Sequence, residues 1–148
     1  MSISFEIKPF EALSTNELYE TLRLRSEVFI VEQNCVYQDI DGKDHKALHL
    51  LGTFDTKIVA YARIFKRGDY FDNPSIGRVV IDKDFRDRKW GHDLMQEAIA
   101  GIGNHFGESP ITISAQLYLK KFYESHGFLQ IGETYLEDGI PHIEMLRS

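Results

Sequence analysis

One stretch of the chain decides its fold class: Val79-Val80-Ile81-Asp82-Lys83-Asp84-Phe85-Arg86-Asp87-Arg88-Lys89-Trp90-Gly91-His92. An apolar, strand-like run passes here through a basic loop into the start of a helix. The first turn of a helix has unpaired N–H groups and the positive end of the helix dipole, so it attracts anions. From Arg86 to Gly91 the loop has three basic residues against one aspartate, and the glycine would let a phosphate approach the backbone. We expect a phosphate site at this turn, with a solvated, helix-capping turn as the plainer alternative.

Hydrophobic periodicity on both sides of this stretch predicts the element order β-α-β-β-β-α-β-α-β-β. A capping box, Ser14 with Glu17, opens the first helix, and Gly127 follows the last helix as a left-handed cap. The alternation of strands and helices in the centre predicts parallel pairing there, with antiparallel strands elsewhere. The predicted helices cover about 15–31, 91–105 and 117–126, and the predicted strands cover 3–8, 47–53, 57–65, 76–81, 111–115, 128–136 and 140–146.

Size, charge and cysteine content exclude several classes of protein. The 148 residues fit one domain, 1–148, with 43% hydrophobic residues, which argues against a disordered chain. A net charge of -6 disfavours a nucleic-acid or anionic-membrane surface. The single cysteine, Cys35, excludes an intrachain disulfide and favours a cytoplasmic location. We expect no signal peptide, and no apolar run approaches the ~20 residues that span a bilayer.

The phosphate stretch resembles motif A of the GNAT superfamily of acyl-CoA-dependent N-acyltransferases, which reads Gln/Arg-x-x-Gly-x-Gly/Ala. Arg86 and Gly91 match this motif, whereas Lys89 replaces its first glycine. The run Leu119-Lys120-Lys121-Phe122-Tyr123-Glu124-Ser125-His126-Gly127-Phe128 resembles motif B, whose core is Phe-Tyr-x-x-x-Gly-Phe. The ElaA-like branch of the superfamily is similar in three further blocks, namely 22–35, 41–44 with His49, and 137–142. Together these blocks cover nearly the whole chain.

The resemblance implies an α/β fold with a mixed, twisted and splayed β-sheet flanked by helices. Acyl-CoA would lie between strands 76–81 and 111–115, and an amine would attack the thioester directly in a ternary complex. The implied reaction is transfer of an acetyl group from acetyl-CoA to a primary amine. Gln116 is expected at the pantetheine or acetyl group, and Trp90 either on the adenine or on the protein. The other implied donor contacts are Val79, Val80 and Ile81 for pantetheine, and Arg86, Asp87, Arg88, Lys89, Gly91 and His92 for pyrophosphate.

The resemblance makes Tyr123 the candidate proton donor to the departing thiolate, with an aromatic core residue as the alternative. A backbone N–H near Val79 or Val80 is the expected oxyanion donor. The general base is open: His142 and Glu144 share one face of a predicted strand, Glu32 and His49 are further candidates, and a chain of water molecules would also serve.

Other chemistries are less well supported by the residues. Cys35 has no catalytic partner at a recognisable spacing, so we expect an unreactive thiol. His45 and His49 do not complete a metal site, and we assign no metal. Two alternative functions remain open: a non-catalytic acyl-CoA-binding regulatory module, and an acyltransferase with another acyl donor, such as the acyl-homoserine-lactone synthases. Members of the superfamily often form homodimers, and the resemblance leaves that state open.

The segment from Glu32 to Asp44 is acidic, with four carboxylates against Lys43. If it borders the cleft, it would attract a cationic amine acceptor by its charge. The alternative is an ordinary solvated loop far from the cleft.

Overall fold

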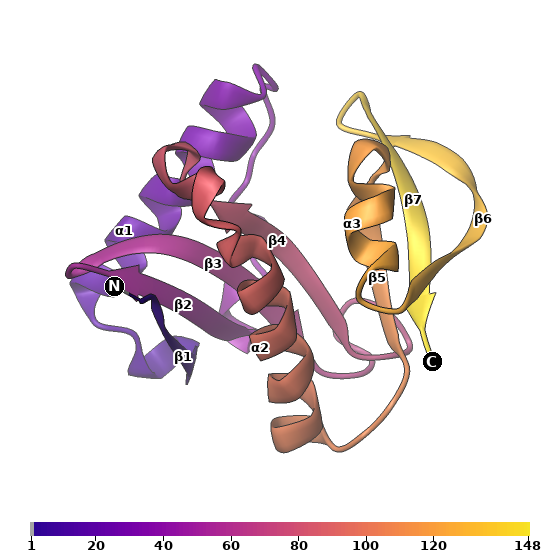
Figure 1. Ribbon diagram of the computed structural model, residues 1–148, viewed down its shortest axis with the longest axis horizontal. Coiled ribbons are helices and arrows are strands. Elements are labelled where there is room, and N and C mark those ends of the chain that lie inside the picture. The colour runs from indigo at the N-terminus through magenta and orange to yellow at the C-terminus, as the bar shows by residue number, and fades with distance from the viewer. Residues whose placement is uncertain (1) are drawn as a thin grey trace.

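Seven strands form one sheet in the order β1-β2-β3-β4-β5-β7-β6 (Figure 1) in the computed structural model, which describes residues 2–148. Neighbouring strands are antiparallel except for β4 and β5, which are parallel. The predicted order of elements along the chain, the parallel central pair and the fold class are therefore confirmed. The strands are β1 Ser4–Pro9, β2 Leu48–Phe54, β3 Lys57–Phe65, β4 Ser75–Ile81, β5 Ile111–Gln116, β6 Phe128–Glu137 and β7 Ile140–Arg147.

Two helices cover opposite faces of the β1–β4 part of the sheet, α1 Thr15–Arg25 and α2 Trp90–Phe106 (Figure 1). Leu50 packs in the cluster with α2, and its neighbour Leu51 packs in the cluster with α1. Burial on both faces explains why β3 reads as one apolar run rather than as an alternating strand. The short helix α3 Lys120–Glu124 lies against the β5–β7 part.

The parallel strands β4 and β5 meet only at their first residues within the described chain. Ser75 is in register with Thr112, and the Thr112 N–H donates to the carbonyl of Pro74 at 3.0 Å. Beyond this point β4 pairs only with β3, and β5 pairs only with β7. The sheet is thus splayed between its two central strands, as expected.

Two predicted helices differ in detail from the structure. The helix predicted over 15–31 is α-helical to Arg25 and continues as a π-helical segment, Ser26–Glu32. Hydrophobic spacing does not distinguish these windings, and π segments are frequent at functional sites. The helix predicted over 117–126 is a 3₁₀ turn, Leu117–Leu119, followed by α3. Within residues 2–148, no helix is both long and apolar enough to cross a bilayer.

Candidate active site

A cavity of about 600 Å³ lies between the separated parts of β4 and β5. Its walls come from the π-helical segment, from β3 and β4, from the start of α2, and from the β5–α3 and β6–β7 regions. The elements that the sequence predicts around an acyl-CoA site therefore converge on one space. The predicted site residues that line it are Val79, Val80, Ile81, Arg86, Lys89, Gly91, His92, Gln116, Tyr123 and His142.

The start of α2 is open towards this cavity. Lys89 precedes the helix with φ 61° and ψ 25°, a left-handed conformation, and provides no side-chain cap. The N–H groups of the first turn therefore lack a side-chain acceptor, which suits an anion. Lys89 adopts the conformation that glycine, its counterpart in motif A, reaches without strain. A Cβ on Gly91 would meet only Phe122, at 3.5 Å, so this glycine leaves room on its cavity side.

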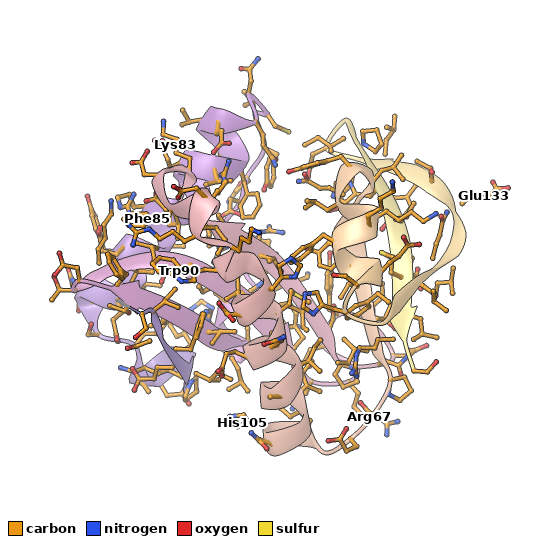
Figure 2. All side chains as sticks on the ribbon, in the orientation of Figure 1. Arg67, Lys83, Phe85, Trp90, His105 and Glu133 are labelled. Carbon is orange, nitrogen blue, oxygen red and sulfur yellow. The ribbon has the colours of Figure 1, made fainter. Side chains whose placement is uncertain are left out.

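Arg88, a predicted phosphate contact, and Trp90 have side chains that pack on the protein. The Trp90 indole is buried and packs 5.1 Å from the ring centre of Phe54. The Arg88 guanidinium lies 4.8 Å from the same ring centre and 5.3 Å from that of Trp90, as in a cation–π contact. Figure 2 shows Phe85 and Trp90 on the side of α2 away from β5. Trp90 therefore packs on the protein, one of the two places expected for it, and Asp87, Arg88 and Trp90 all lie outside the cavity lining.

Arg86 lines the cavity but already has a partner. Its guanidinium forms two hydrogen bonds with the Glu32 carboxylate, of 2.5 and 2.7 Å, and also donates to the carbonyl of Ile81. These bonds hold the pKa of Glu32 below its ordinary value, so Glu32 is a poor candidate for a base. Lys89 also lines the cavity, and its side chain forms no ion pair with the described residues 2–148.

Tyr123 is buried and lines the cavity. Its ring packs edge-on against Phe122 and Phe128. Burial, with a smaller contribution from Tyr118, raises the pKa of Tyr123 above its ordinary value, so the phenol stays protonated at neutral pH. Tyr123 thus belongs to the core and also borders the cavity, and its role as a proton donor stays a prediction.

A polar group stands on the opposite wall, around His142 and Glu137. The two side chains are 3.4 Å apart, and His142 Nδ1 lies 2.7 Å from the carbonyl of Ile140. Ser114 donates to Glu137 at 3.3 Å and hydrogen bonds Tyr135, whose ring stacks on His142. His142 therefore has a carboxylate partner at the cavity, and Glu137 is a site residue that the sequence reasoning missed.

Three other candidates lie apart from the cavity. Both ring nitrogens of His49 are used, by Tyr61 at 2.6 Å and by the carbonyl of Asp44 at 2.9 Å, and burial lowers its pKa. Glu144 does not line the cavity, although it shares a face of β7 with His142. Cys35 donates to the carbonyl of Asp138 at 3.2 Å and is also absent from the lining.

Two further predicted site residues, Gln116 and His92, form hydrogen bonds with neighbouring side chains. The amides of Gln116 and Gln33 hydrogen bond each other in both directions, at 3.2 and 3.3 Å. His92 and His126 are joined by a 3.0 Å hydrogen bond, and burial together with His92 lowers the pKa of His126. Within residues 2–148, no three His, Cys, Asp or Glu side chains form a group suited to a metal ion.

The acidic segment does not have the charge expected of it. Asp39 and Asp44 are buried, and ion pairs join the aspartates of this segment to Arg25, Arg63 and Arg78. Despite the opposing effect of burial, the Arg63 hydrogen bonds hold the pKa of Asp41 far below its ordinary range. The expectation of an acidic rim that attracts a cationic amine is therefore wrong, because three arginines balance the three aspartates.

Arg63 and Arg78 also line the cavity, and sequence reasoning missed both. Each is a charged residue within an otherwise apolar strand run, which is unusual for a buried strand. That contrast was the available signal, together with the excess of aspartates nearby.

Comparison with known proteins places these features in a family. The family profile described as "Acetyltransferase (GNAT) domain" matches residues 12–148. Protein ElaA of Escherichia coli is 45% identical over 138 residues, which cover 92% of this chain and 90% of that protein. The crystal structure of Escherichia coli ElaA superposes with a TM-score of 0.92 at 42% identity, covering 99% of this chain and 100% of that chain.

A second similar structure is that of a protein described as an acyltransferase. An acyl-CoA N-acyltransferase from Pseudomonas aeruginosa superposes with a TM-score of 0.94 at 38% identity, covering 99% of this chain and 100% of that chain.

Proposed function

The chain belongs to the GNAT acyltransferase family, and on that premise we propose that it transfers an acetyl group from acetyl-CoA to a primary amine. The observation that carries this proposal is the cavity between β4 and β5, which joins the open start of α2 to Tyr123. An anion site and a protonated phenol on one cavity suit a thioester donor that carries a pyrophosphate.

The donor contacts follow from the cavity lining. The pyrophosphate would bind the first turn of α2, with Lys89 and His92 beside it. The backbone of Val79, Val80 and Ile81 would pair with the pantetheine arm, since among residues 2–148 this part of β4 has no strand neighbour on the cavity side. Gln116 would contact the donor after breaking its hydrogen bonds to Gln33. Arg86 would contribute its positive charge.

Acetyl-CoA would supply the thioester that the amine attacks. Tyr123, a neutral phenol on the cavity wall, would donate its hydroxyl proton to the departing thiolate. An N–H near Val79 or Val80 would stabilise the oxyanion. His142, held by the carbonyl of Ile140, would accept the proton of the ammonium, and Glu137 would stabilise the imidazolium that results.

The variant Tyr123→Phe tests this proposal. It retains the ring and its packing, so acetyl-CoA binding measured by calorimetry should stay within about twofold, whereas turnover should fall by ~10²–10⁴. Turnover is read as thiol release and acetylated product with a panel of primary amines. Tyr19→Phe, at an exposed tyrosine on α1, is the matched control.

Two results would count against the proposal. Near-full turnover by Tyr123→Phe would return this tyrosine to a purely structural role. Tight acetyl-CoA binding with no product from any amine would favour the non-catalytic acyl-CoA-binding module instead.

A further inference from the structure

Two arginines on the cavity wall take part in neither donor binding nor proton transfer. Arg63 on β3 lies opposite Gly77 of β4, and Arg78 follows that glycine, so the two side chains belong to one region of the wall. Both line the cavity, whereas Asp39, Asp41 and Asp44, which pair with them, do not. The arginines therefore stand between the aspartates and the cavity.

Each arginine retains unused donor capacity. Arg78 donates from Nε to Asp39 Oδ1 at 2.7 Å and from Nη2 to the Asp39 carbonyl at 3.0 Å, and no acceptor among residues 2–148 is recorded for its Nη1. Arg63 Nε is buried and has no acceptor in the described chain. The Arg63 side chain is only 1% exposed whereas that of Arg78 is 18% exposed, so Arg63 supplies charge to this wall and Arg78 Nη1 is the donor that an anionic oxygen in the cavity would meet.

The opposite side of the same space is acidic. Glu137 and Asp138 line the cavity beside His142, and the Glu137 side chain is 39% exposed. A carboxylate at an open position can receive an ammonium group.

Tyr70 and Tyr37 each experience the charges of both the acidic and the basic side of the cavity. Burial raises the pKa of Tyr70, the charge of Glu137 raises it further, and the charges of Arg78 and Arg63 lower it. The Tyr70 hydroxyl is therefore within electrostatic range of both sides. The Arg78 guanidinium lies 5.9 Å from the ring centre of Tyr37, and the Asp138 carboxylate also acts on that phenol.

We propose that the acceptor is an apolar α-amino acid, with its ammonium group at Glu137 and its carboxylate at Arg78, supported by Arg63. This rests on the proposed acetyl transfer and adds the class of the amine. The apolar side chain would pack on Phe65, Tyr70 and Ile76, which line the cavity near the two arginines. One positive and one negative group on facing walls match a zwitterion, whereas a simple amine would leave Arg78 Nη1 without an acceptor in the cavity.

The reaction is balanced with groups already described. The ammonium gives one proton to His142, and the free nitrogen forms a C–N bond with the acetyl carbon while the C–S bond breaks. The thiolate takes the proton of Tyr123, and the second proton then leaves the nitrogen and restores the Tyr123 hydroxyl. His142 passes its proton to solvent, so the products are an N-acetyl amino acid, CoA and one proton. The product has lost the charge that Glu137 binds, which favours its release.

Matched acceptors test the proposal on the full chain. Phenylalanine is compared with phenethylamine, and leucine with isopentylamine, using acetyl-CoA and detection of the acetylated product by mass. We expect kcat/KM at least about tenfold higher for each amino acid than for its amine, the range of one charge-assisted contact. Arg78→Gln should remove this preference by raising KM for the amino acid alone. Arg67→Gln, an exposed arginine outside the cavity lining (Figure 2), should retain it.

The outcomes separate this inference from the acetyl transfer itself. Equal or better use of the simple amines would overturn the amino-acid acceptor and leave the transferase intact. Calorimetric titration of phenylalanine onto CoA-saturated protein gives a second answer that does not need turnover, and absence of binding there would also overturn it. If Arg78→Gln does not fold, the wild-type comparison decides alone. Failure of the wild type to bind acetyl-CoA would overturn both proposals.

Discussion

The two long helices begin in opposite ways. At the start of α1, the Glu17 N–H donates to Ser14 Oγ at 3.0 Å, and Glu17 Oε1 accepts from the Ser14 N–H at 2.8 Å. At the start of α2, Lys89 adopts a left-handed conformation without a side-chain cap, beside the cavity. The first helix has its end capped by its own side chains, whereas the start of the second has no side-chain cap. Under the proposed function, the missing cap rather than the basic charge of the loop distinguishes the helix that would bind the donor.

The largest expected effect is at the open end. Gly91→Glu places bulk and negative charge where the phosphates would lie, so acetyl-CoA affinity measured by calorimetry should fall at least about a hundredfold. Gly91→Ala separates the two causes, because its Cβ meets Phe122 at an ordinary contact distance of 3.5 Å. Gln96→Glu adds the same charge at an exposed site further along α2 and is the control. Unchanged affinity in folded Gly91→Glu would remove the distinction between the helices.

A substitution at the capped start of α1 should change the stability of the protein and leave acetyl-CoA binding unchanged. Ser14→Ala removes the acceptor of the Glu17 N–H and should lower the free energy of unfolding by about 1 kcal/mol. Acetyl-CoA affinity should not change, because α1 begins away from the cavity lining. Ser14→Gly is the matched variant and should cost only a few tenths of a kcal/mol. A loss of CoA affinity in Ser14→Ala would mean that the two helix ends are coupled.

Lys89 sharpens the comparison, because its left-handed backbone should lower the stability of the fold while its charge should strengthen acetyl-CoA binding. Lys89→Gly relieves the left-handed strain, and should raise the free energy of unfolding by roughly 0.5 kcal/mol after the greater freedom of glycine in the unfolded chain is subtracted. It should also weaken acetyl-CoA binding, most strongly at low salt. Lys89→Ala removes the same charge but keeps the Cβ, so it should weaken binding without the gain in stability. Equal stability of the two variants would contradict the strain.

The smallest expected effect is the pH dependence of the α1 cap. The hydrogen bond from the Ser14 N–H, aided by Lys8, lowers the pKa of Glu17 in the folded state below its ordinary value near 4.5. Because the pKa of Glu17 is lower in the folded than in the unfolded state, this stabilisation is fully present above the unfolded-state pKa. It is lost as the pH falls through the folded-state pKa. Denaturant unfolding of the wild type and Glu17→Gln should therefore differ at neutral pH and converge in acid. Parallel curves throughout would refute the assignment.

Local rules explain why much of the fold was predictable from the sequence. The capping box at Ser14 and the left-handed Gly127 depend on residues within one turn of the chain. The order of elements along the chain follows from apolar runs and their connections, and the motif A and motif B residues indicate the family.

Side-chain direction and long-range pairing explain what the sequence did not reveal. Arg88 and Lys89 are adjacent and equally charged, yet Arg88 stacks on Phe54 while Lys89 faces the cavity. Glu137 meets Ser114 across 23 residues of chain, and Arg78 meets Asp39 across 39. Such pairs depend on the tertiary register, so the acidic segment was interpreted without the arginines that neutralise it.

The central claim is that the open start of α2 receives the phosphates of acyl-CoA while the closed start of α1 does not. The most direct test is a titration of the isotope-labelled protein with CoA, followed by amide NMR. The account predicts large shifts at Trp90, Gly91 and His92, and none at the amides of Thr15 to Glu17. Shifts confined to other parts of the chain, with the first turn of α2 unchanged, would contradict it.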